Sequence, residues 1–450
     1  MRKIVFLLFI IFMNALSVCA NPVDKTINSL HVNKGALAVS VRDVKTGNSV
    51  YSLNSGMMVN PASTLKLITF ASVANTLGFD YEVSTVLYKS TNNDLYLKLV
   101  GDPLLASSDL NKLMDTAKEK NIITPKNIYV DSSLFDNVEW GEGWQWDDDL
   151  NPLMPKFSAY NLDKNLLNIV ITPIGKDIVP TVAVKPFYPL TFMNFLSTDY
   201  LSKENKITFS KNPDIENIIN ISGQVSSGVT KNLPVPNLRR YFILRLEKAI
   251  SSSKIEYYAP IKNSILPSEN VYKVEEVSHS LSDIAKMVLK DSNNMAAESI
   301  FKLAGAIYSN SQGSIENSLK MLSNYLSSIG LDVSDVKIVD GSGVSKNNLV
   351  SSDFMTQFLC AKSNESDFET YYDLMVSPGQ GTLKNRMLYF KDNLKAKTGT
   401  LSGVSAIAGY ITTRKGRLLA FDIMINDTKA SSYDKKNIEE QILRQIYMNY

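Results

Sequence analysis

One helical turn separates a serine from a lysine in the stretch Ser63-Thr64-Leu65-Lys66, which follows Pro61. Proline suits the first turn of a helix because it lacks an N–H group. Ser63 is therefore expected near a helix N-terminus, where the dipole favours negative charge, with Lys66 on the same face. A serine hydroxyl is a weak nucleophile until a base accepts its proton, and a neutral lysine is such a base. Taken alone, the stretch fits a surface helix with a solvated lysine better.

Two further short motifs follow in a fixed order, and the three together indicate a serine acyl-transfer site whose base is a lysine. They are Ser292-Asn293-Asn294 and Lys397-Thr398-Gly399-Thr400. A second Lys-Thr-Gly tripeptide, beginning at Lys45, lies between two alternating runs at 36–42 and 48–53, which is typical of a hairpin turn. It also precedes every candidate nucleophile. Order and context therefore select the C-terminal copy.

The second motif lies between two predicted helices, at 281–290 and 294–307. A tight bend there would present the side chains of Ser292 and Asn294 to a cleft. Ser292 could then relay a proton between Lys66 and a leaving amine, and the Asn294 amide could hold a backbone group of a substrate. Ordinary helix capping by serine and asparagine is the alternative.

The third motif opens a stretch of small and apolar residues and is expected to form an edge strand beside the site. Alternation along a strand turns Lys397 and Gly399 inward and Thr398 backward. Gly399 would let a ligand approach the backbone, Lys397 could attract a substrate carboxylate, and the Thr398 and Thr400 hydroxyls could bind it. The alternative is an exposed strand with a solvated lysine.

Two consequences follow if the motifs meet in space. The N–H groups of Ser63 and Thr400 could form an oxyanion hole, in which each donor typically contributes about 10²–10³ in rate. Burial and the nearby cation Lys397 would both lower the pKa of Lys66, which must be neutral to act as a base.

The first twenty residues have the pattern of a secretory signal peptide. Arg2 and Lys3 precede an apolar run from Ile4 to Met13, and small residues allow cleavage before Asn21. The apolar run is too short for a membrane span. Cleavage before Cys19, as in a lipoprotein, is the alternative.

Charge, cysteine and histidine content exclude several classes of function. The formal net charge of +2 falls to zero when residues 1–20 are removed, which argues against electrostatic binding of nucleic acid. Cys360 would then be the remaining cysteine and is expected to be a small buried hydrophobe. His31 and His279 cannot supply a three-histidine zinc site, and neither lies in a metal or triad motif. We expect no metal or organic cofactor.

The 229 positions from Ser63 to Ser292 imply that the chain leaves the catalytic core and returns. A strand-rich insert is predicted at about 82–270, with one clear helix at 237–250 and a second small β unit nested within 168–236. The flanking parts look α/β. Their predicted elements are a hairpin at 36–53, helices at 281–290, 294–307, 314–328, 352–363 and 433–447, and strands at 404–412 and 417–425.

With these motifs the chain resembles the penicillin-binding serine acyltransferases, and more narrowly the class C D-alanyl-D-alanine carboxypeptidase/endopeptidase family. The long insert after the first motif is a mark of that family, and so are four other stretches. They are Gly101-Asp102-Pro103-Leu104, Trp144-Gln145-Trp146-Asp147-Asp148, Asp340-Gly341-Ser342-Gly343-Val344-Ser345, and Gly381-Thr382-Leu383 with Arg386. The likeness covers nearly the whole mature chain and is weaker within 168–236. Asn293 departs from the family, which usually has Asp at this position.

The resemblance implies an α/β (α+β) penicillin-recognising domain of the β-lactamase/transpeptidase type with a large, mainly β insert of two nested subdomains. We expect the split serine peptidase domain at 21–81 and 271–450, an inserted domain II at 82–167 and 237–270, and a nested domain III at 168–236. The resemblance also implies a role for each motif residue. Ser63 would be the nucleophile, Lys66 the base and Ser292 the proton carrier, and substrate would be bound by Asn294, Lys397, Thr398, Gly399 and Thr400.

The implied function is that of a serine D-Ala-D-Ala carboxypeptidase, a D,D-endopeptidase or both, acting on peptidoglycan stem peptides through an acyl-enzyme on Ser63. β-Lactams would acylate the same serine. We expect export to the periplasm or the exterior of the cell envelope, with peripheral membrane association left open. A serine β-lactamase is one alternative, although such enzymes usually lack so large an insert. A non-catalytic wall-binding protein is the other, and the presence of all three motifs argues against it.

Overall fold

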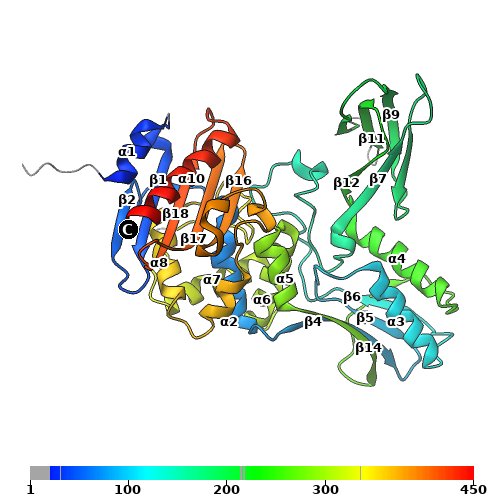
Figure 1. Cartoon of the computed structure of the whole chain (residues 1–450). Coiled ribbons are helices and arrows are strands. Elements are labelled where there is room, and N and C mark those ends of the chain that lie inside the picture. The colour runs from blue at the N-terminus through cyan, green and yellow to red at the C-terminus, as the bar shows by residue number, and fades with distance from the viewer. Residues whose placement is uncertain (1–20, 31, 213–214, 216–217, 335) are drawn as a thin grey trace, which may run out of the picture.

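The computed structural model describes residues 21–30, 32–212, 215, 218–334 and 336–450, and these form two lobes (Figure 1). One lobe is built from both ends of the described chain around a five-stranded sheet. The other lobe is made by the middle of the chain. The predicted signal segment 1–20 and His31 lie outside the described residues. Among the helices of these residues, none combines the length and hydrophobicity that a membrane crossing requires.

The central sheet joins the two ends of the chain in the antiparallel order β16-β17-β18-β1-β2. Its strands are β1 (Leu37–Asp43), β2 (Ser49–Leu53), β16 (Leu394–Leu401), β17 (Val404–Thr412) and β18 (Leu418–Asn426). The predicted hairpin and the two predicted C-terminal strands are confirmed. The Lys-Thr-Gly tripeptide at Lys45 lies in the turn between β1 and β2, and the third motif lies on the edge strand β16, both as predicted.

Helices cover both faces of this sheet (Figure 1). They are α1 (Pro22–Ser29), α2 (Lys66–Leu77), α5 (Leu281–Ala285), α6 (Asn294–Ser309), α7 (Ile315–Ser328), α8 (Ser352–Lys362), α9 (Phe368–Leu374) and α10 (Ser432–Asn449). The predictions for α6, α7, α8 and α10 are confirmed to within two residues at each end, the usual uncertainty of a helix boundary. The predicted helix at 281–290 is helical throughout, but α5 continues from residue 286 as a π turn.

Alternate residues of the central strands belong to two different hydrophobic cores. Ile407 and Phe421 join the core under α1 and α10, whereas Ala408 and Met424 join the larger core on the opposite face. α8 packs on that second face, and α2 lies behind it against α6 and α7. Because both faces are covered, β17 and β18 are buried along almost their full length. Cys360 is buried on α8, as predicted, and burial raises the pKa of its thiol to about 11.

A second five-stranded sheet, in the order β13-β6-β5-β4-β14, forms the base of the other lobe (Figure 1). The elements of this base are β4 (Glu82–Ser90), β5 (Leu95–Lys98), α3 (Ser107–Glu119), β6 (Ile128–Asp131), α4 (Leu238–Ser252), β13 (Lys262–Asn263) and β14 (Val271–Ser280). Strand β14 pairs with β4 over 271–280, beyond the predicted return to the core at 270. The predicted helix at 237–250 is confirmed as α4. Sequence reasoning missed α3, although Leu110, Leu113 and Met114 are buried along one side of it.

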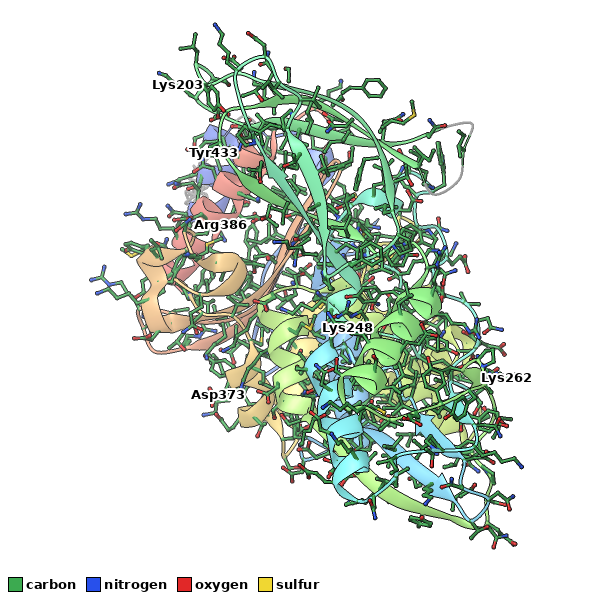
Figure 2. All side chains as sticks on the ribbon, turned by 90° about the vertical axis from the view of Figure 1, so that its right-hand side faces the viewer. Lys203, Lys248, Lys262, Asp373, Arg386 and Tyr433 are labelled. Carbon is green, nitrogen blue, oxygen red and sulfur yellow. The ribbon has the colours of Figure 1, made fainter. Side chains whose placement is uncertain are left out.

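Two three-stranded sheets form a separate β unit beyond α4, in the orders β12-β7-β8 and β10-β11-β9. The strands are β7 (Leu166–Thr172), β8 (Thr181–Lys185), β9 (Thr191–Thr198), β10 (Lys206–Lys211), β11 (Ile218–Val225) and β12 (Val229–Pro234). Lys203, between β9 and β10, lies at the outer end of this unit, far from Lys248 on α4 (Figure 2). A small β unit was expected in this part of the chain. We keep the division into three domains as a proposal, and the pairing of β14 with β4 places residues 271–280 in the sheet of the insert.

Candidate active site

Ser63 lies in a tight turn that leads into α2. A 3-10 turn over Ala62–Leu65 precedes the helix, and the backbone of Ala62 has a positive φ of 47°, which L-residues rarely adopt. The side chain of Asn60 stabilises this turn, because its oxygen accepts a hydrogen bond from the Ala62 N–H at 2.9 Å. The Asn60 amide donates in turn to the carbonyl of Ser345 at 2.9 Å. The nucleophile candidate is therefore held on a strained turn, as is common for functional residues.

The Lys66 amine is buried and contacts the Ser63 hydroxyl directly. Its Nζ lies 2.9 Å from Ser63 Oγ and also donates to the Asn294 side-chain oxygen and the Ser342 carbonyl, each at 2.6 Å. A protonated lysine has three N–H donors for these three acceptors. A neutral amine has a lone pair that can accept the Ser63 proton instead. The arrangement thus suits both states of a proton acceptor.

The pKa of Lys66 is lowered to about 7. Burial is the main cause, because it disfavours the charged form, and the negative charges of Asp340 and Glu298 oppose the shift. Burial and Lys397 were both expected to lower the pKa of Lys66. The effect of one lysine on the other instead falls on Lys397, whose pKa is lowered well below its usual range, first by burial and then by the charge of Lys66.

Ser292 occupies the bend between the π turn after α5 and the start of α6. Its backbone has a positive φ of 58°, so the bend is as tight as the sequence suggested. The Ser292 hydroxyl accepts a hydrogen bond from Lys397 Nζ at 2.7 Å. Lys397 is fully buried on β16 and also donates to the carbonyl of Thr398 at 2.7 Å. The structure therefore pairs Ser292 with Lys397, whereas the sequence analysis placed it between Lys66 and the leaving group.

The two asparagines of the second motif have different roles. Asn293 is the N-cap of α6, and its side-chain oxygen accepts the Ala296 N–H at 2.8 Å. Aspartate, the usual residue of the family at this position, can make the same cap. Asn294 reaches Lys66 with its oxygen and donates its amide to the carbonyl of Leu153 in the insert at 2.8 Å. Asn294 thus connects Lys66 to a loop of the insert.

Gly399 faces the turn at residues 61–63, which carries the candidate nucleophile and is called the nucleophile turn below. A Cβ at this position would lie 2.9 Å from the Ala62 Cβ, the Pro61 carbonyl oxygen and the Ser63 nitrogen. The inward orientation predicted for Gly399 is correct. The close neighbour is the backbone of the protein itself, however, and not only an approaching ligand.

The two threonines of the third motif differ in exposure. Thr398 is buried, and its hydroxyl donates to the Thr382 hydroxyl at 2.8 Å, on the backward side of the strand as predicted. Thr400 is exposed at the end of the motif. Of the two hydroxyls, Thr400 is the better placed to meet a ligand from solvent.

Hydrogen bonds thus join the first motif to the second through Lys66 and Asn294, and the second to the third through Ser292 and Lys397. Sequence reasoning missed two buried acids behind Lys66, Glu298 and Asp340. Asp340 appeared only within a stretch that resembles the family. The sequence does contain one sign of Glu298. It is a lone acid in an apolar stretch of helix, four residues after Asn294. No group of three or more His, Cys, Asp or Glu side chains among the described residues could hold a metal ion.

A serine hydroxyl in contact with a buried lysine of near-neutral pKa is the arrangement expected of a serine acyl-transfer site. The split α/β lobe around it belongs to the β-lactamase/transpeptidase type of fold. The sequence profile of the D-Ala-D-Ala carboxypeptidase 3 (S13) family matches residues 19–446, so the chain belongs to this family. It is a serine-type D-Ala-D-Ala carboxypeptidase, and the family predicted from the motifs is confirmed.

Known proteins resemble the chain over most of its length. A D-alanyl-D-alanine carboxypeptidase from Actinomadura sp. is 26% identical over 425 residues, which cover 87% of this chain and 78% of that protein. The crystal structure of penicillin binding protein 4 (dacB) from Haemophilus influenzae has a TM-score of 0.83 at 20% identity, covering 95% of this chain and 99% of that chain. Its complex with a β-lactam has a TM-score of 0.78 at 19% identity with the same coverage. At such identity the structural likeness establishes the fold.

Proposed function

We propose that Ser63 and Lys66 carry out the acyl transfer on peptidoglycan stem peptides that end in D-Ala-D-Ala. Ser63 Oγ attacks the carbonyl carbon between the two D-alanines, and Lys66 Nζ accepts the hydroxyl proton. The carbon–nitrogen bond then breaks, and the terminal D-alanine leaves as an amine after gaining a proton. Water hydrolyses the ester on Ser63 and returns the enzyme to its starting state.

The contact between Ser63 Oγ and Lys66 Nζ carries this proposal. The two atoms are 2.9 Å apart, within the distance that direct proton transfer requires. Because the pKa of Lys66 is about 7, a substantial fraction of the lysine is neutral at neutral pH. An ordinary lysine, with a pKa near 10.4, would be almost entirely charged and unable to act as a base.

Ser292 and Lys397 are the proposed source of the proton for the leaving amine. The Ser292 hydroxyl can give its proton to the departing nitrogen while it takes one from Lys397 Nζ, 2.7 Å away. Lys397 can supply this proton only in its charged form, which burial and the charge of Lys66 disfavour and a nearby carboxylate favours. This assignment keeps Ser292 as the proton carrier and changes the residue that supplies the proton.

The third motif is the proposed binding site for the carboxylate of the terminal D-alanine. An incoming carboxylate favours the charged form of a nearby lysine, so substrate binding would restore the charge that burial disfavours on Lys397. The exposed Thr400 hydroxyl can donate to the same group. Thr398, Gly399 and Asn294 remain proposed substrate-binding residues. Each also contacts another part of the site and so helps to position it.

The same acyl-enzyme allows two peptidase activities and one form of inhibition. Carboxypeptidase action releases free D-alanine, whereas endopeptidase action releases the amine of a cross-linked neighbouring peptide. A β-lactam presents a strained amide to the same hydroxyl and leaves a stable ester. The Haemophilus influenzae relative has been crystallised in complex with a β-lactam, which supports binding of this class of inhibitor.

The site of action that we propose is outside the cytoplasm, in the periplasm or on the exterior of the cell envelope. Two features support this location. The substrate class is part of the cell wall, and residues 1–20 have the composition of a secretory signal.

Labelling with a fluorescent penicillin tests the assignment of Ser63. Wild-type protein should become covalently labelled with one fluorophore per chain, and Ser63→Ala should not be labelled while its melting temperature stays close to that of wild type. Ser327→Ala, an exposed serine on α7, serves as the matched control and should be labelled like wild type. Mass spectrometry of defined muropeptides then shows whether D-alanine or a cross-link is released. Full labelling of Ser63→Ala would refute the assignment.

A further inference from the structure

A buried carboxylate, Glu298, lies behind the catalytic lysine and has no part in the mechanism above. It follows Asn294 by four residues on α6, so the two side chains share one face of the helix. Glu298 is fully buried. Its two oxygens accept hydrogen bonds from the backbone N–H groups of Gly341 at 3.0 Å and Ser342 at 2.7 Å.

Glu298 reaches Lys66 through a single residue. The N–H of Ser342 donates to Glu298, and the carbonyl of the same Ser342 accepts the hydrogen bond from Lys66 Nζ at 2.6 Å. The position of that carbonyl therefore depends on the carboxylate. Because Asn294 also holds Lys66, α6 supports the lysine from two directions, once directly and once through the 341–342 backbone.

Glu298 also acts on Lys66 through its charge. The groups that interact electrostatically with Lys66 come from three elements: Glu298 on α6, Asp340 in the loop after α7, and Lys397 on β16. The two acids favour the charged lysine and so oppose the effect of burial. In return, burial and the charge of Asp340 raise the pKa of Glu298, and the hydrogen bonds from the Gly341 and Ser342 N–H groups oppose this shift.

We propose that Glu298 is a positioning residue for the base, which holds the Ser342 carbonyl against Lys66 and places a negative charge behind the lysine. The inference rests on the proposed function, because it requires Lys66 to be the proton acceptor. Glu298 would then contribute to acylation from a fully buried position, without contacting substrate.

Asp340 has a different environment, which makes Glu298 the better residue to test. Four donors surround the Asp340 carboxylate: the N–H groups of Gly343 and Ser345 and the side chains of Asn348 and Trp144, at 2.7–2.9 Å. These contacts tie the 340–348 loop to Trp144 of the insert. A substitution at Asp340 would therefore disturb the loop and the packing of the insert together, whereas Glu298→Gln keeps the shape of the side chain and removes its charge.

The test is the pH dependence of the second-order rate of acylation by a fluorescent penicillin between pH 5 and 9. Removing the negative charge removes a group that stabilises the ammonium, so the rising limb for Lys66 should move to lower pH in Glu298→Gln. An opposite charge in such an environment typically shifts a pKa by about one unit or more. The plateau should fall by about tenfold, because Gln has one acceptor oxygen for two N–H donors and small displacements of catalytic groups are costly.

Two further variants separate charge from position. Glu298→Asp keeps the charge but is too short to hold both N–H groups, so its plateau should fall while its midpoint stays close to that of wild type. Glu316→Gln, an exposed glutamate paired with Lys320 on α7, is the control and should change neither quantity.

The possible results are distinct. A Glu298→Gln profile with the wild-type midpoint overturns the inference even if its plateau is lower, since a purely structural residue would behave that way. If Glu298→Gln fails to fold, a wild-type plateau in Glu298→Asp overturns it. The proposed function fails separately, if wild-type protein shows no rising limb near pH 7 or if Ser63→Ala is acylated.

Discussion

Replacing Gly399 with alanine probes how closely the edge strand fits the nucleophile turn. The added methyl would lie 2.9 Å from three atoms of residues 61–63, two of them backbone atoms. Ordinary contact begins at 3.4 Å, so the strand and the turn must separate by about half an ångström. The φ of Gly399 lies outside the left-handed region, so the strain of this substitution comes from contact and not from backbone conformation.

The size of the effect follows from that displacement. The nucleophile turn carries the Ser63 nitrogen, a candidate oxyanion donor, and β16 carries Thr400, the other candidate. Catalytic groups must be held to within about 0.5 Å, and a 1 Å error can reduce rates about a hundredfold. We therefore expect Gly399→Ala to slow acylation by about tenfold. Overpacking of this kind also destabilises a fold by about 1–3 kcal/mol, so the melting temperature should fall by a few degrees.

Stopped-flow measurement of penicillin acylation, combined with thermal unfolding, provides the assay. Gly56→Ala is the matched control, because a Cβ at Gly56 would have no neighbour within 4 Å and its backbone is not left-handed. That variant should acylate and melt like wild type. Acylation of Gly399→Ala at the wild-type rate would show that the turn and the strand can separate without affecting the chemistry, and would refute this reasoning.

Two other expectations follow from the buried charges. Acylation of wild-type protein should rise with pH through a midpoint near 7, where Lys66 loses its proton. Lys66→Arg should lose at least about 99% of the rate, because arginine stays charged. Near-normal labelling of that variant would exclude Lys66 as the base. Asp422 on β18 is fully buried, neither of its oxygens has a hydrogen-bond partner among the described residues, and burial raises its pKa well above the ordinary value of 3.8. Because the folded state keeps this proton while the unfolded chain releases it, the carboxyl destabilises the fold increasingly as pH rises above about 4. Asp422→Asn should therefore melt at a higher temperature than wild type at pH 8, with the difference vanishing near pH 4, and equal melting temperatures at pH 8 would contradict this account.

Features with a local cause were the ones that the sequence predicted well. The hairpin at the Lys45 tripeptide depends on a few neighbouring residues. The bend at Ser292 is of the same kind. The order of the three motifs added long-range information, because the chemistry works only if the motifs meet.

Features that depend on contacts between distant segments could not be predicted in the same way. The role of Gly399 comes from the arrival of the turn at 61–63, and Thr398 meets Thr382 only after the chain has folded back. Glu298 becomes a support for the base because the 340–348 loop lies beside α6. The pairing of Ser292 with Lys397 rather than Lys66 depends on the exact depth of each side chain, which spacing along the chain does not determine.

The order of strands in the central sheet determines when the enzyme can first become active during its synthesis. The edge strand with Lys397 is joined to the N-terminal hairpin only through β17 and β18, which are the last strands to be made. A growing or truncated chain that ends before Asn426 has the nucleophile but no completed sheet on which to assemble the remaining motif. Partial chains should therefore be chemically silent.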